Sequence, residues 1–174
     1  SSDLATAGRL ARRVQFRVSL LEGVERLPEG MSRWLSAAPP VDLMQVAALR
    51  PEFNAETELR GLKAHKGVSV VASSSVSAAN NREVSVQATD QTTAVRLRFV
   101  PAILASNRFT LRVQPEVVAS GWSRKIDTEV ELLDGQSFVV TGLTPGGADV
   151  RPLMVLVTSQ MEKPVDTAAL QREP

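Results

Sequence analysis

The fold of this chain is decided by residues 94–117, which read AVRLRFVPAILASNRFTLRVQPEV. Apolar and polar residues alternate on both sides of Ser106-Asn107, so every second side chain points to the same face. The apolar positions are Val95, Leu97, Phe99, Phe109, Leu111 and Val113, and arginines occupy positions 96, 98 and 112. This pattern predicts two antiparallel strands joined by a short turn, with one buried face and one polar face.

The same alternation predicts further strands on either side of this hairpin. They are expected at residues 13–22, 68–75, 83–88, 126–133, 136–143 and 153–161. Asp134-Gly135 predicts a two-residue hairpin turn of type I′, which needs positive φ at both positions.

One main helix is expected before these strands. Asn54 is a good N-cap, Glu56 and Glu58 lie in the first turn, and Gly67 follows the last turn. Residues 42–50 predict one or two further helical turns, which Pro51 would end.

These elements predict an α+β fold that is mostly β, with one helix packed on an antiparallel sheet of about seven to nine strands. The β-rich domain is expected to span residues 14–161. Residues 1–13 are interpreted as a linker or short helix, and the polar residues 162–174 as a flexible tail.

The composition argues against an enzyme. The chain has no Cys and a single His, so thiolate chemistry is excluded. One His is too few for a metal site built mainly from histidines. The net charge is +1 and aromatic residues make up 4%, which does not favour nucleic-acid binding. We therefore expect no catalytic residue, no cofactor and no metal. No apolar run reaches the roughly 18 residues of a spanning helix, and no signal-peptide pattern is expected at the start.

The polar faces of the predicted strands carry opposite charges. Arg96, Arg98 and Arg112 lie on the hairpin, and Glu129 and Glu131 lie on a later strand. Facing opposite charges stabilise strand pairs by roughly 0.2–1 kcal/mol each. The side chains either form local pairs on a solvated face or pair with a neighbouring subunit, which makes these five residues candidate inter-subunit contacts.

Trp122 lies between Gly121 and Ser123 in a short connection. An exposed Trp at this place would anchor the chain at a membrane interface or to a partner. The alternative is that the ring folds back over the end of the sheet.

An ordered series of segments resembles the C-terminal module of the secretins, the ring-forming outer-membrane channels of type II and type III secretion, type IV pili and phage export. The segments are VQFRVSLLE (14–22), LRGLKAHKGVSVVASSSV (59–76), NNREVSV (80–86), LRFVPAI (97–103), FTLRVQPEV (109–117), DTEVELLDGQSFVVTGL (127–143) and LMVLVT (153–158). The connections at 87–96 and 118–126 are too short for the gate and lip insertions of that family.

The resemblance implies a secretin-like structural module that forms a homo-oligomeric ring or channel, with strands shared in a closed β-barrel. It implies transport by a secretion or pilus machine, envelope protein partners, and a place in the periplasm or outer membrane of a Gram-negative-type bacterium, with membrane contact left open. The alternative is a monomeric, non-enzymatic β-rich adaptor that binds an envelope partner by strand addition.

Overall fold

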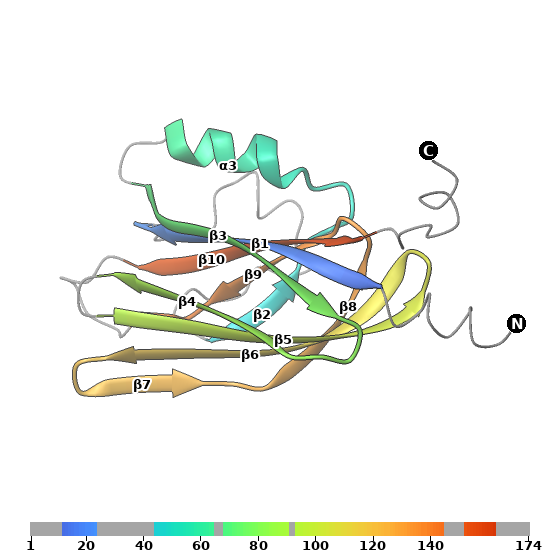
Figure 1. Ribbon diagram of the computed structural model, residues 1–174. Helices are drawn as coiled ribbons and strands as arrows, with labels where there is room; N and C mark the ends of the chain where they lie inside the picture. Colours follow the sequence, from blue (N-terminus) through green and yellow to red (C-terminus); the bar gives the residue numbers. More distant parts are fainter. Residues whose placement is uncertain (1–11, 24–43, 65–67, 91–92, 145–151, 163–174) are drawn as a thin grey trace, which may run out of the picture.

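A computed structural model describes residues 12–23, 44–64, 68–90, 93–144 and 152–162. Within these ranges the chain forms one helix and ten strands, which confirms the mostly-β α+β class (Figure 1). The elements are β1 (Arg13–Glu22), β2 (Gln45–Ala48), α3 (Ala55–Ala64), β3 (Ser69–Ala79), β4 (Val84–Asp90), β5 (Thr93–Ala105), β6 (Arg108–Ala119), β7 (Trp122–Lys125), β8 (Thr128–Leu133), β9 (Ser137–Thr141) and β10 (Leu153–Met161). The predicted linker up to residue 11, the helix end at Gly67 and the tail from residue 163 lie outside the described residues.

The strands form two five-stranded antiparallel sheets, not the single sheet that was expected. Sheet A has the order β2-β9-β10-β1-β3. Sheet B has the order β4-β5-β6-β7, and β8 pairs with β6 beside β7. One sheet of this length would leave one apolar face in water, so the chain folds into two sheets that cover each other.

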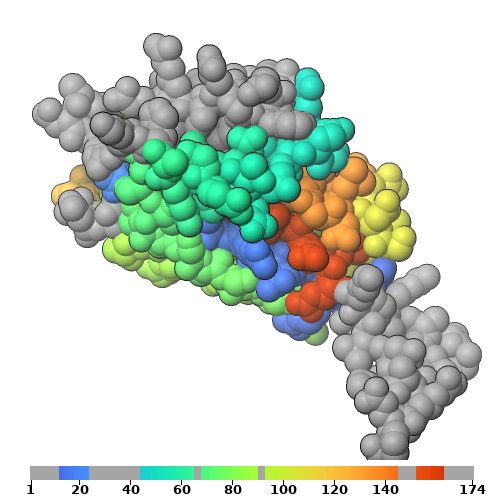
Figure 2. All heavy atoms as spheres, turned by 90° about the horizontal axis from the view of Figure 1, so that it is seen from above, coloured from blue at the N-terminus to red at the C-terminus, as the bar shows by residue number. Residues whose placement is uncertain are grey.

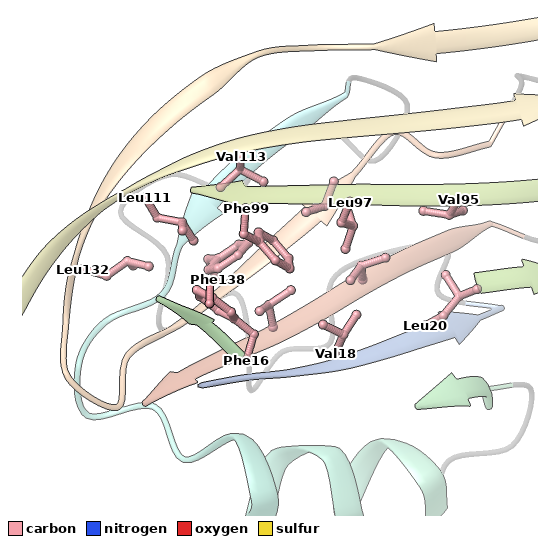
Figure 3. Packing of buried hydrophobic residues seen from close by; sticks show 14 of the residues in the cluster. Phe16, Val18, Leu20, Val95, Leu97, Phe99, Leu111, Val113, Leu132 and Phe138 are labelled. Atoms are coloured by element: carbon pink, nitrogen blue, oxygen red, sulfur yellow. The ribbon is translucent and has the colours of Figure 1, made fainter. Parts of the chain in front are cut away.

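The core lies between the two sheets and is centred on three aromatic rings. Phe16 of β1 stacks on Phe99 of β5 with ring centroids 4.7 Å apart, and Phe99 meets Phe138 of β9 edge-on at 6.1 Å. Figure 3 shows these rings between the β1–β10 layer and the β5–β6 layer. The apolar positions predicted for the hairpin at 94–117 all point into this core.

Helix α3 covers the outer face of sheet A and makes a third layer (Figures 1 and 2). The Oδ1 atom of Asn54 accepts a hydrogen bond of 3.1 Å from the backbone N–H of Thr57, as an N-cap does. Leu62 and Phe53 are buried in a second apolar cluster with Leu21 of β1 and Leu156 of β10. The predicted helix is thus confirmed, and its apolar stripe faces the sheet.

The helical turns predicted at residues 42–50 are wrong, because the chain there forms β2. Val46 and Ala47 pair with Val140 and Val139 of β9. A short apolar run is ambiguous between helix and strand, and here the edge of sheet A offers a partner that a helical turn would leave unpaired.

Candidate assembly interface

The sandwich has two open sides, and they differ in character. On one side, β3 pairs with β1 and β4 pairs with β5, and among the described strands neither has a second partner. Residues 68–81 contain no charged side chain, and neither do the first six residues of β4. We call β3 and β4 the uncharged side. Edge strands are usually protected from pairing with other chains by charge, proline or short length. The eleven residues of β3 carry none of these protections.

The opposite side is formed by β2, β7 and β8, and we call it the charged side. The strands β2 and β7 have four residues each and β8 has six. Two of them carry charges, at Arg124 and Lys125 of β7 and at Glu129 and Glu131 of β8. Short strands and charged side chains commonly keep an edge strand from pairing with other chains. The charged side has both features, and β3 on the uncharged side has neither.

The outer face of sheet B holds all five candidate contact residues. Arg96, Arg98, Arg112, Glu129 and Glu131 are exposed, and each lies opposite the buried face that their strands share. The structure thus brings together on one face the charges that the sequence pattern placed on the polar sides of separate strands. Their pairing with a neighbouring subunit stays a prediction.

Arg112 already has a strong partner in its own chain. Its Nε donates a 2.9 Å hydrogen bond to Oδ1 of Asp127, and its Nη2 donates a second to Oδ2. Gln114 Nε2 donates a third hydrogen bond, of 3.1 Å, to the same carboxylate. The hydrogen bond from Arg112 and then that from Gln114 lower the pKa of Asp127 to about 2. The same contact with Asp127 raises the pKa of Arg112.

Some of the remaining charged side chains on this face have an ion-pair partner in their own chain, and others do not. Arg108 pairs with Glu131 at 3.2 Å, a contact the sequence pattern did not indicate because it depends on register. Arg98 lies between Gln114 and Ser85, and Arg96 lies between Glu116 and Gln87. Within the described ranges, neither Arg96 nor Arg98 has a carboxylate within 4 Å. These two arginines lie one strand away from the edge β4.

The turn at Asp134-Gly135 is present, but it does not close a hairpin. It leads from β8 in sheet B to β9 in sheet A, and these two strands are not paired. The φ of Gly135 is +84°, whereas Asp134 has no positive φ, so the turn is not of type I′. Gln136 N donates a hydrogen bond of 3.0 Å to Leu133 O across the turn.

Side chains of this turn tie the two sheets together, a role that the sequence pattern did not reveal. Met161 N donates a hydrogen bond of 2.7 Å to Oδ1 of Asp134, and Gln136 Nε2 donates one of 2.6 Å to Leu49 O. The hydroxyl of Ser159 donates 2.7 Å to Gln136 O. The residues DGQ therefore act as a cross-sheet clamp as well as a turn.

Trp122 packs on the sandwich. Its half-buried ring contacts the main core cluster, and the guanidinium of Arg124 lies over it at 4.8 Å from the centroid. Arg124 Nη1 also donates 3.1 Å to Gly142 O of the other sheet. The use of Trp122 as a membrane-interface or partner anchor stays a prediction.

A hollow of about 620 Å³ lies between α3 and the outer face of sheet A. Its lining mixes Arg17, Arg60 and Lys63 with Glu52 and Glu56 around an apolar floor. In the described part of the chain, no three acidic or histidine side chains gather as metal ligands would. Among the same residues, no helix is long and apolar enough to cross a membrane.

Two solved structures of secretins are similar to this chain. One is the type II secretion secretin XcpQ from Pseudomonas aeruginosa, at 13% identity over 92% of this chain, with a TM-score of 0.34. The other is InvG (residues 176–end), the secretin of the Salmonella SPI-1 type III secretion injectisome in its open gate state, at 10% identity over 92% of this chain, with a TM-score of 0.29. The matches cover 57% and 62% of those two chains. No protein-family model matches the chain, and no curated protein matches its sequence.

Proposed function

We propose that this chain is a non-enzymatic structural subunit that assembles head to tail into a ring of the secretin type. The observation that carries the proposal is the uncharged side, where β3 has eleven residues and neither β3 nor the first six residues of β4 carry a charge or a proline. Pairing with another copy removes such edges, and a rotation that closes on itself gives a ring. The ordered segments that resemble the secretin module support a place in the envelope, in a secretion or pilus machine.

Strand directions decide which sheet can continue from one copy to the next. In sheet B, β4 runs opposite to β5, β5 opposite to β6, and β6 opposite to both β7 and β8. Copies in a ring share one direction, so β4 of one copy would run antiparallel to β7 or β8 of the next. In sheet A, β3 and β2 run the same way and would meet in parallel. Antiparallel pairing is slightly more stable per residue, which favours continuity through sheet B.

Charge favours β8 over β7 as the partner of β4. Within one copy, β4 lies level with β7, since both are opposite the same stretch of the β5–β6 hairpin. A level contact would bring Arg96 and Arg98 toward the neighbour's basic Lys125. A staggered contact would bring them toward Glu129 and Glu131 of the neighbour instead. Stagger of this kind is what closing a sheet into a barrel requires.

The distances allow this contact. The arginines on β5 and the glutamates on the neighbour's β8 would be separated by two strand spacings, about 9–10 Å. The intervening side chains on β4 are Ser85 and Gln87, which are short or uncharged. An arginine side chain on β5 and a glutamate side chain on the neighbour's β8 are together long enough to meet across these two strand spacings.

The test is the mass of the purified chain in solution, measured by light scattering over a range of protein concentrations. The proposal expects a defined multiple of 18.8 kDa and closed rings in electron micrographs. A mass of 18.8 kDa at every concentration would overturn it.

The open edge of β3 also favours a second candidate, a monomeric adaptor that binds an extended peptide of an envelope partner by strand addition. This candidate predicts a monomer whose β3 amides become protected from hydrogen exchange only when the partner is added. The ring predicts protection without any partner, and chiefly in β4.

A further inference from the structure

A hollow of about 320 Å³ lies at the end of the sandwich where β1 begins and β5 reaches its turn. It is lined by Arg12, Asn80, Ile103, Leu104, Ala105 and Ser106. Its lining contains no residue of β4, β7 or β8, the strands considered for the proposed ring contact.

Arg12 leaves a donor unpaired at this place. Its Nε atom is buried and has no hydrogen-bond partner. Within the described ranges, no carboxylate lies within 4 Å of its guanidinium. Buried donors on charged groups are costly when unpaired, and such an atom in a native fold points to a missing partner.

A β-bulge leaves the side chain of Leu104 exposed beside this hollow. The pairing of β5 with β6 passes from Ile103–Phe109 directly to Ala105–Arg108, so Leu104 has no partner across the hairpin. Leu104 is 52% exposed, more than any other exposed large apolar residue in the described part of the chain. Bulges redirect side chains and are common beside binding sites.

The other lining groups are also donors or apolar. The Oδ1 atom of Asn80 accepts a 2.8 Å hydrogen bond from Ile103 N, and its amide NH₂ is a further donor on this side chain. Ser106 adds a hydroxyl, and Ile103 adds apolar surface next to Leu104. The described residues of the lining include one arginine and no carboxylate, so they carry a positive charge.

We propose that this hollow binds an aliphatic carboxylate, either as a free acid or as the C-terminal carboxylate of a peptide that ends in an aliphatic residue. The Arg12 guanidinium has the fork geometry that pairs with a planar carboxylate. The aliphatic group covers Leu104 and Ile103. One ligand thus pairs with the Arg12 guanidinium and covers the exposed leucine.

The experiment is calorimetric titration of the full chain with matched small probes. N-acetyl-leucine supplies both the carboxylate and the aliphatic group, N-acetyl-leucinamide lacks the charge, and N-acetylglycine lacks the aliphatic group. We expect saturable binding of N-acetyl-leucine and at least about tenfold weaker binding of each control, as expected for one lost charge-assisted bond or one lost aliphatic contact. Equal binding of acid and amide, or no binding of the acid at millimolar concentration, overturns the proposal.

Variants locate the site, and a peptide identifies the source of the ligand. Arg12→Gln and Leu104→Ser should each weaken binding of N-acetyl-leucine, whereas the controls Arg17→Gln in β1 and Leu133→Ser in β8 should not. Binding that survives Arg12→Gln unchanged overturns the assignment. Acetyl-Ala-Ala-Leu should bind tighter than N-acetyl-leucine if the natural ligand is a peptide terminus, and equally if it is a free acid. Should a variant not fold, the comparison of acid and amide on the unmodified chain still decides.

Discussion

The uncharged and charged sides of this sandwich have similar turns between the two sheets but different edge strands. On each side one sheet passes into the other through a tight turn with a left-handed residue, Asn81 between β3 and β4 and Gly135 between β8 and β9. Each turn is bonded to both sheets: Asn80 to Arg12 and Ile103, and Asp134 to Asn107 and Met161. Only the edge strands differ in length and charge. In the proposed ring, this difference in the edge strands serves the contact between copies.

The largest effect is expected from making the uncharged side acidic. In the double variant Ser85→Glu, Gln87→Glu, the new carboxylates lie opposite Arg98 and Arg96 of the same copy, so the fold should keep or gain stability. In the proposed ring they would face Glu129 and Glu131 of the next copy, and the like charges should reduce the mass to 18.8 kDa.

The matched control carries lysines at the same two positions. It should keep the assembled mass while the melting temperature falls, because lysines repel the arginines of their own copy and attract the neighbour's glutamates. If both double variants assemble like the unmodified chain, β4 is not the contact strand.

The next effect tests whether the two turns support the fold equally. Valine at Gly135, where φ is +84°, or at Asn81, where φ is 61°, forces a β-branched residue into the left-handed region. Each change should lower the free energy of unfolding by about 1–3 kcal/mol, measured by denaturant unfolding.

Gly61→Ala in α3 is the control with the opposite sign. Apart from the helix backbone and the adjacent residues, no atom lies within 4 Å of the added methyl group, and alanine in a helix should stabilise the fold by about 0.5–1 kcal/mol. A valine at Gly135 that costs nothing would contradict the clamp role of this turn.

A smaller effect is expected from a single charge reversal across the proposed contact. Arg98→Glu should weaken assembly without removing it, since Arg96 keeps its attraction to the neighbour. Glu129→Arg added to it should restore part of the loss, because a true pair couples in a double-mutant cycle. Salt should weaken assembly as well, since exposed charges are screened over about 8–10 Å at physiological ionic strength. A ring that responds neither to reversal nor to salt would show that these faces do not meet.

The sequence was informative where a property depends on neighbours along the strand, and uninformative where it depends on register. Alternation predicted that Phe99 is buried and Arg98 exposed, because side chains of a strand point to opposite faces. It did not predict two sheets, since the period says which residues are buried but not what covers them. Asp134-Gly135 was interpreted as a hairpin because consecutive strands usually pair, and here they belong to different sheets. The Arg112–Asp127 contact joins residues 15 apart and depends on how the loop after β7 returns.

The smallest effect concerns one carboxylate on the charged side, Asp127. Its pKa of about 2 is below the usual 3.8, so the favourable contribution of its ion pair is complete above pH 4 and is lost as the pH falls from about 4 to about 2. A carboxyl NMR titration should give this low midpoint in the unmodified chain, and a midpoint back toward 3.8 in Arg112→Gln. Gln114→Ala should raise the pKa less, because it removes the weaker of the two hydrogen-bond contributions. Since the partners of Asp127 belong to its own chain, the midpoint should be the same in the monomeric Ser85→Glu, Gln87→Glu variant as in the assembled protein. A pKa that rises on dissociation would mean that a neighbour's cation also reaches this carboxylate, and the charged side would then use Asp127 as well as Glu129 and Glu131 in the contact.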